Sequence, residues 1–272
     1  MSNIVSMATN SNLINSMFST RNTGKQNSVT SLWNNYSATN GFTSASGMSA
    51  ANLYGVKESY AELVSSYNTA KDSFYADLDS DMADLKDAAA AIKNTNFNVG
   101  ENAVTTTTSV NDEGETVTTK KYNENLQNAL DAVNKLVDSY NSTNTLLSDS
   151  AELSPRLKNA AKMFSDTTAR ADLYESIGIS VGSGGKLTVD EDKLVSAITD
   201  DPNRVTRILG EGGLADKAES HVSRLESQQG QLFPTLSSMY GSQVKAAEAY
   251  TGSAAASMLG YANVGNLMNM FF

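Results

Sequence analysis

The chain contains no cysteine, three prolines and one histidine among 272 residues. The absence of cysteine excludes disulfides and thiolate metal sites, and a single histidine excludes histidine-rich metal centres. The scarcity of proline favours long helices, because proline interrupts a helix interior. No run of about 18 apolar residues is present, so the sequence predicts no membrane span.

Positive charge is also scarce, because 30 acidic residues outnumber 20 basic ones and leave a net charge of −10. Phosphate backbones repel such a chain, so nucleic acid is not an expected partner. Residues 1–18 lack both the basic start and the continuous apolar segment of a secretory signal peptide. If the protein leaves the cell, it is expected to use a route without a cleaved signal peptide.

Apolar residues at three- and four-residue steps predict helices over most of the chain. The first long helix is expected from about residue 49 to 94, which exceeds ordinary helix length and is typical of a coiled-coil-like bundle. A second is expected over 123–147, a third is opened by Ser154 and Pro155 and extends to Leu173, and a fourth runs from Leu214 toward Pro234. Threonine-rich runs within 99–120 predict a β-hairpin at the end of two helices.

The densest local signals lie in residues 173–214. Apolar residues alternate over 177–181 and again over 187–189, with a glycine-rich reversal between them, so a second β-hairpin is expected at 177–189. Asp190 is expected to cap a helix that presents Leu194, Val195 and Ile198 on one face. Asp201 and Pro202 then open another short helix. The fold class is therefore mainly α, an elongated antiparallel helical bundle or coiled coil with two small β-hairpins.

The usual chemical signatures fail when they are checked residue by residue. Asp77, Asp79 and Asp81 have the opening spacing of a calcium loop, but Met82 and Ala88 replace its glycine and closing glutamate, so these acids are interpreted as a solvated helix face. Gly185 and Lys186 fit a hairpin turn better than a phosphate-binding loop. His221, the only histidine, is interpreted as a surface or seam residue rather than a base. No catalytic, cofactor or metal site is predicted, and the protein is not expected to be an enzyme.

Two segments carry a resemblance to a known family. The first segment contains six short motifs in a fixed order. They are a leucine (Leu173), Ile-Gly-Ile (177–179), Gly-Lys-Leu (185–187), a helix start Asp-Glu-x-Lys-Leu (190–194), Asp-Pro-x-x-Val (201–205) and Gly-Leu-Ala (213–215). Upstream, residues 136–141 are similar to a helical Phe-Val-x-x-Tyr-Asn motif, with Leu136 in place of phenylalanine. Over about 123–230 the chain resembles the bacterial flagellar filament-capping protein family, also called flagellar hook-associated protein 2.

This resemblance implies a structural assembly protein at the distal tip of the bacterial flagellum, a filament cap or cap-like subunit that promotes flagellin insertion. Larger members carry big outer domains where only a short hairpin fits here. The resemblance implies a ring-forming homo-oligomer, with flagellin, hook-filament axial proteins and an export chaperone as partners. It also implies a secreted, extracellular location. The alternatives are a filament or hook-filament junction subunit, or a secreted adhesin of the same export route.

Three domains are expected. Residues 1–48 form a flexible N-terminal arm with a short amphipathic helix, 49–233 a helical-bundle core with both hairpins, and 234–272 an apolar C-terminal helical tail. The apolar ends are unfavourable in a monomer and are explained if neighbouring copies bury them. The expected oligomer or filament interface is Leu13, Ile14, Met17, Phe18, Leu259, Tyr261, Leu267, Met268, Met270, Phe271 and Phe272.

Overall fold

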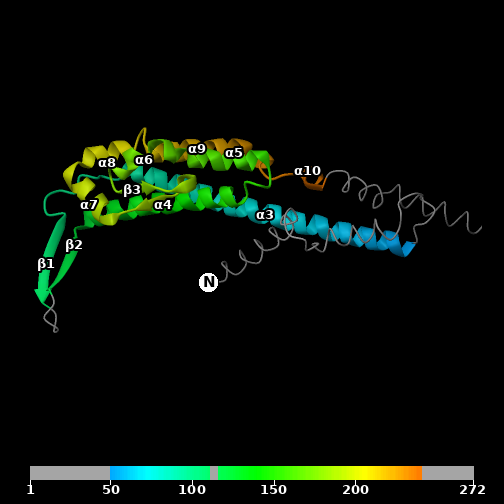
Figure 1. The fold of residues 1–272 in the computed structure, drawn as a ribbon, viewed down its shortest axis with the longest axis horizontal. Helices are drawn as coiled ribbons and strands as arrows, with labels where there is room; N and C mark the ends of the chain where they lie inside the picture. Colours follow the sequence, from blue (N-terminus) through cyan, green and yellow to red (C-terminus); the bar gives the residue numbers. More distant parts are fainter. Residues whose placement is uncertain (1–49, 111–115, 241–272) are drawn as a thin grey trace, which may run out of the picture. The chain divides into compact units, whose positions relative to one another are not determined.

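The computed structural model describes residues 50–110 and 116–240, and it is mainly helical with two small antiparallel strand pairs (Figure 1), as the sequence predicts. The chain divides into two compact units. One comprises residues 1–74 with 234–272, and the other comprises residues 75–233. The predicted division into arm, core and tail stays a prediction.

Helix α3 (Ala50–Asn94) confirms the expected long first helix, and it is 45 residues long. Phe74, the last residue of α3 in the first unit, is buried. In the same unit, the Tyr67 hydroxyl donates a hydrogen bond to the Pro234 carbonyl at 2.9 Å, shortly before the short helix α10 (Leu236–Tyr240). The remainder of α3 belongs to the second unit, where its buried face is Leu78, Met82, Leu85, Ala88, Ala89 and Ile92. These positions follow the three- and four-residue steps predicted from the sequence.

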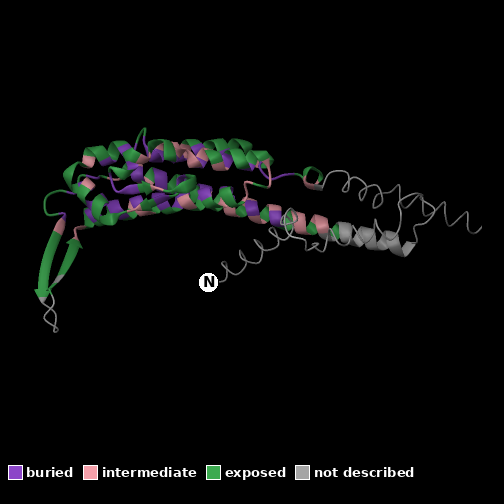
Figure 2. Cartoon of the chain, viewed as in Figure 1, coloured by how far each residue is buried: buried purple, intermediate pink, exposed green. Residues whose placement is uncertain are grey.

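The second unit is built from α3 after Phe74 and a series of shorter helices. Helix α4 (Glu124–Asp149) contacts α5 (Pro155–Phe164) and α7 (Glu191–Asp200), while α9 (Leu214–Gln228) contacts α5 and α8 (Pro202–Leu209). Lys93 on α3 pairs with Asp216 and Glu219 on α9. Leu136, Val137 and Tyr140 are buried on α4, as their spacing predicts. Figure 2 shows the buried positions gathered on the facing sides of these helices.

Short polar residues start these helices where the sequence places them. The side chains of Ser154, Asp190 and Asp201 accept hydrogen bonds from the main-chain N–H groups of the first turns of α5, α7 and α8. Pro155 and Pro202 occupy first helical positions, where the missing N–H costs nothing. Local sequence chemistry therefore sets where these three helices begin.

Both predicted hairpins form. Strands β1 (Val104–Val110) and β2 (Thr116–Tyr122) pair antiparallel, as do β3 (Ile179–Val181) and β4 (Leu187–Val189). A short 3-10 turn, η4 (Ser183–Gly185), connects β3 to β4. The β3–β4 pair lies against α4 and α6 (Ala171–Glu175), whereas the side chains at the middle of β1 are exposed.

The predicted continuous helix from Pro155 to Leu173 is wrong. Helix α5 ends at Phe164, a 3-10 segment η3 (Ser165–Arg170) follows, and α6 carries Leu173 with 42% of its surface exposed. The hydroxyls of Ser165 and Thr168 bond to main-chain carbonyls three residues earlier, which competes with regular helix formation. The helix expected to run from Leu214 toward Pro234 is shorter than predicted. Helix α9 ends at Gln228, and a 3-10 turn η5 (Gln229–Gln231) follows.

Candidate functional site

The two segments that carry the family resemblance meet in the structure. The Asn141 side chain on α4 donates from Nδ2 to the Leu187 carbonyl and accepts at Oδ1 from the Leu187 N–H, both at 2.8 Å. This pair of bonds, the Asn141 clamp, reproduces on a side chain the pairing that a neighbouring strand would give. One turn later, Asn144 Nδ2 donates to the Gly184 carbonyl at 2.9 Å. Helix α4 thereby holds the β3–β4 hairpin at Gly184 in the turn and at Leu187, where β4 begins.

Gly185 closes the other side of the same turn. It has φ +79°, a conformation that side chains other than glycine rarely adopt. A Cβ at this position would lie 2.6 Å from Ser165 Cα and 2.8 Å from the Phe164 carbonyl oxygen, so the chain approaches η3 too closely for any other residue. The buried Thr167 hydroxyl donates to the Gly185 carbonyl at 3.0 Å. The Gly-Lys-Leu motif is therefore fixed between α4 and η3.

Gly178, in the Ile-Gly-Ile motif, likewise allows a close approach between two segments of the main chain. Its φ is +87°, and a Cβ there would lie 2.6 Å from the Leu194 nitrogen. The Gly178 carbonyl accepts a hydrogen bond from the Asp190 N–H at 2.7 Å, just where Asp190 caps α7. Strand β3 is thereby joined to the helix start that the same sequence series contains. The motif residues act as a scaffold that links β3, β4, α4 and α7.

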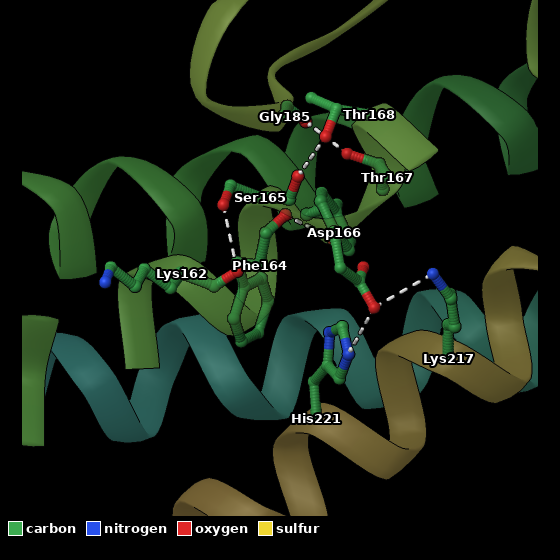
Figure 3. Close-up of polar contacts among 10 residues, drawn as sticks. Lys162, Phe164, Ser165, Asp166, Thr167, Thr168, Gly185, Lys217 and His221 are labelled. Carbon is green, nitrogen blue, oxygen red and sulfur yellow. Dashed lines mark hydrogen bonds and ion pairs between the residues drawn. The ribbon is translucent and has the colours of Figure 1, made fainter. Parts of the chain in front are cut away.

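A polar cluster lies beside this scaffold and includes the only histidine of the chain (Figure 3). His221 on α9 has a side chain that is 9% exposed, and its Nε2 lies 3.5 Å from Asp166 Oδ2. The same carboxylate oxygen pairs with Lys217 Nζ at 2.9 Å. The Phe164 ring packs against the imidazole with centroids 5.0 Å apart. The structure thus places His221 in a buried seam, in agreement with one of the two interpretations of the sequence, and not on the surface.

Burial governs the charge states in this cluster. Burial lowers the pKa of His221, and the nearby Lys217 and Arg224 lower it further, while Asp166 acts in the opposite direction. Burial likewise raises the pKa of the Tyr140 and Tyr174 hydroxyls, which therefore stay neutral. Tyr140 donates to the Phe164 carbonyl at 2.7 Å. Among the buried side-chain nitrogen and oxygen atoms of the described residues, Asp166 Oδ1, the Tyr174 hydroxyl and His221 Nδ1 have no hydrogen-bond partner.

This cluster has the histidine and carboxylate of a hydrolytic triad but not its nucleophile. Within residues 50–110 and 116–240, no serine or threonine hydroxyl is hydrogen-bonded to His221. A triad needs a nucleophile within hydrogen-bond reach of the imidazole and access for a substrate. The arrangement therefore supports packing and charge compensation rather than acyl transfer.

We expect the free energy of unfolding to decrease as the pH is lowered, over a pH range determined by the pKa of His221. Its pKa is lower in the folded state than its ordinary value near 6.5, so the unfolded chain binds this proton first as the pH drops. The stabilisation is complete above pH 6.5 and is lost as pH falls from there toward the folded-state pKa. Chemical denaturation of wild type and His221→Gln between about pH 7 and 5 measures the difference. Equal pH slopes in the two proteins would refute this assignment.

The remaining predicted features are placed as follows. Asp77, Asp79 and Asp81 lie on α3. Asp79 is exposed, while Asp81 is half-buried and accepts a hydrogen bond from the Ser142 hydroxyl at 2.8 Å, so the predicted fully solvated face is only partly correct. Burial raises the pKa of Asp77 and Asp81. No group of three potential metal ligands occurs among the described residues.

One shallow groove borders the scaffold, with a volume of about 420 Å³. Glu175, Asp192 and Asp200 line it together with Lys193 and Arg204, so its walls carry both signs of charge. That mixture selects no particular ligand class. The predicted interface residues fall outside the described part of the chain: Leu13, Ile14, Met17, Phe18, Leu259, Tyr261, Leu267, Met268, Met270, Phe271 and Phe272.

The residues missed at the level of sequence are those whose roles depend on distant partners. Asn141 belongs to the motif at residues 136–141, but nothing near it in the chain indicates that it binds Leu187, 46 residues away. Thr167 and Asp166 gave no periodic or motif signal at all. Their spacing from the glycine-rich turn is set only by the path of the folded chain.

Fold and scaffold together define a mainly helical protein in which a small β-hairpin is fixed onto a helix by side-chain hydrogen bonds. No family model, no curated protein and no solved structure matches this chain. Among the described helices, none combines the length and the apolar character needed to cross a membrane.

Proposed function

We propose that this chain is a structural assembly protein of the bacterial flagellum, a filament cap or cap-like subunit at the distal end. The observation that supports the proposal is the Asn141 clamp. The two segments resembling the filament-capping family lie 46 residues apart at their contact point, yet Asn141 and Leu187 bind each other directly. If the two segments matched the family only by coincidence, we would not expect their residues to form a pair of hydrogen bonds with each other in the folded chain.

The architecture proposed with this function is an elongated antiparallel helical bundle with coiled-coil character over residues 49–233. The length of α3 and the buried three- and four-residue steps of α3 and α4 support it. Such a bundle provides rigid legs, while terminal segments adapt to a mismatch with the filament. The protein would hold newly exported flagellin by steric, non-covalent contact until the flagellin folds and inserts.

The proposed partners are flagellin, hook-filament axial proteins, an export chaperone and further copies of the chain in a ring. The proposed location is extracellular, at the filament tip. In this proposal the contacts to neighbouring copies come from the predicted terminal residues, represented by Leu13 and Phe18 at one end and Leu267 and Phe272 at the other. No catalytic step is part of this mechanism.

Electron microscopy of the purified full chain tests this function. We expect closed rings, and we expect removal of residues 259–272 to abolish them while the melting temperature stays nearly unchanged. The reason is that the tail is apolar and is expected to be buried by neighbouring copies rather than within its own chain. Open fibres would instead support a filament or junction subunit.

Two further results would count against these expectations. A truncated chain that still forms rings would contradict the role given to the tail, and a full chain that stays monomeric with purified flagellin present would contradict the cap itself. Amide exchange gives a second readout, because the tail should exchange quickly in the dilute monomer and slowly in the assembly. A tail already protected in the monomer would place it in an ordinary closed helical domain.

A further inference from the structure

The β1–β2 hairpin has one edge whose hydrogen-bonding groups can be assigned residue by residue. The Asn123 N–H donates to the Ala103 carbonyl at 2.9 Å, which makes these two residues a hydrogen-bonded pair at the hairpin base. Hydrogen-bonded and non-hydrogen-bonded pairs alternate along an antiparallel ladder. In the observed register, Thr105, Thr107 and Ser109 therefore bond to β2. The residues that direct their main-chain N–H and C=O groups away from β2 are Val104, Thr106, Thr108 and Val110.

This edge of β1 is open. No hydrogen bond from the described residues reaches the outward main-chain groups of Thr106 and Thr108. Strand β2 lies toward α7, because Lys120 Nζ pairs with Asp192 Oδ1 at 2.5 Å, and Figure 1 draws β1 as the outer strand of the hairpin. Figure 2 shows the strands exposed along most of their length. β1 contains no charged residue, whereas β2 has Lys120 and Lys121, and lysine is a residue that discourages edge pairing.

The sequence of β1 is nearly the same in both directions. It reads Val-Thr-Thr-Thr-Thr-Ser-Val, so reversal about Thr107 exchanges only a threonine for a serine. Two antiparallel copies centred on Thr107 would pair residue 104 with 110 and residue 106 with 108. Those four positions are the ones whose N–H and C=O groups point away from β2. The pairing that aligns the symmetric sequence about Thr107 is therefore also the pairing that satisfies these groups.

We propose that the open edge of β1 binds β1 of a second copy of this chain, forming a four-stranded antiparallel sheet around a two-fold axis at Thr107. About eight main-chain hydrogen bonds would join the copies, two for each of four pairs. A two-stranded hairpin without a packed face is marginally stable by itself, and additional strands stabilise it. The strand edge therefore gains pairing without requiring a new apolar surface.

Charge favours a second copy over an unrelated acidic or basic partner. Strand β1 has no charged residue to attract a partner of either sign, whereas β2 carries Lys120 and Lys121. The paired strands themselves contain no acid, so two chains of net charge −10 would approach at one of their least repulsive places.

The pairing does not rest on the proposed flagellar function. A two-fold contact uses the same surface on both copies and closes at two, whereas a ring requires head-to-tail contacts between different surfaces. Loss of the hairpin contact would therefore leave ring formation through the chain ends unaffected. Failure of either proposal can be recognised without reference to the other.

Cysteine cross-linking tests the axis directly, because the chain has no cysteine of its own. In the paired sheet, Thr107 faces Thr107 of the second copy as a non-hydrogen-bonded pair, with Cα atoms about 4.5 Å apart. That separation is within the range of a disulfide, about 4.4–6.8 Å. Full-length Thr107→Cys should give a disulfide-linked dimer under mild oxidation. Thr119→Cys is the matched control, since those residues would be about 14 Å apart, three strand spacings, and should cross-link far more slowly.

Proline variants test the edge without covalent bonds. Sedimentation equilibrium of the full chain, at concentrations below those at which rings form, should show a dimer with a dissociation constant of about 10–1000 µM, as for a small polar interface. Thr106→Pro removes an outward N–H from the β1 edge and should weaken dimerisation at least tenfold. Thr118→Pro removes an outward N–H from the β2 edge and should leave it unchanged.

Circular dichroism of both proline variants checks that the chain stays folded. A chain that remains monomeric across this concentration range overturns the proposal. Equal weakening by both prolines, or equal cross-linking rates at positions 107 and 119, would overturn it as well. Dimerisation that salt abolishes while Thr106→Pro does not affect it would assign the contact to charge alone and contradict strand pairing.

Discussion

Replacing Gly185 with alanine is expected to lower the free energy of unfolding by about 4 kcal/mol. A positive φ at a residue other than glycine costs about 1–3 kcal/mol, and overpacking a closed site costs a similar amount. Both apply here, because φ is +79° and the new Cβ would overlap Ser165 and the Phe164 carbonyl. These neighbours are main-chain atoms held by η3 and α5, so they cannot move aside as a flexible side chain would. Denaturant unfolding followed by circular dichroism measures the change.

The neighbouring glycine provides a matched control. Gly184 also has a positive φ, +69°, but a Cβ there would meet nothing within 4 Å. Gly184→Ala therefore keeps the conformational cost and removes the steric one, and it should cost only about 1 kcal/mol. If both variants lose the same stability, the close approach of Gly185 to η3 contributes nothing and the turn is not fixed as described.

The second large effect is expected at Asn141. Asn141→Leu removes both bonds of the Asn141 clamp and leaves the N–H and C=O of Leu187, a residue that is 2% exposed, without partners. Each buried main-chain group left unpaired costs about 1–3 kcal/mol, so the loss should be about 3 kcal/mol. Thermal and denaturant unfolding of the full chain would measure it. Asn128→Leu, at an exposed position of the same helix, should change stability by less than about 0.5 kcal/mol.

Asn141→Asp separates the two bonds of the clamp. An aspartate keeps the acceptor for the Leu187 N–H but places a carboxylate oxygen against the Leu187 carbonyl. A protonated aspartic acid can donate a hydrogen bond again, so its folded-state pKa should rise above about 3.9. The stability deficit of this variant should therefore shrink as pH falls toward 4. A deficit independent of pH would mean that Asn141 Nδ2 is not a donor to this carbonyl.

The sequence by itself determined the local structure of this protein. Capping by Asp190 and Asp201 and the turn glycines act within a few residues, so the starts of α7 and α8 and the β3–β4 hairpin could be predicted. The apolar steps of α3 and α4 are set by helix geometry alone, and the buried positions followed from them. The threonine-rich strands of the first hairpin were predicted on the same local basis.

Only the tertiary structure decided which of these elements meet. The Asn141 clamp joins residues 46 positions apart, and Gly185 touches η3 because α4 and α5 bring the two segments together. That contact also accounts for the wrong prediction of a continuous helix to Leu173, since Thr167 in η3 bonds to the Gly185 carbonyl of the β3–β4 turn and the segment does not continue the α-helix. For the same reason, the sequence left open whether His221 lies at the surface or in a seam between helices, and the structure shows that it is buried in a seam. Its burial depends on Phe164 and Asp166, whose positions no local pattern specifies.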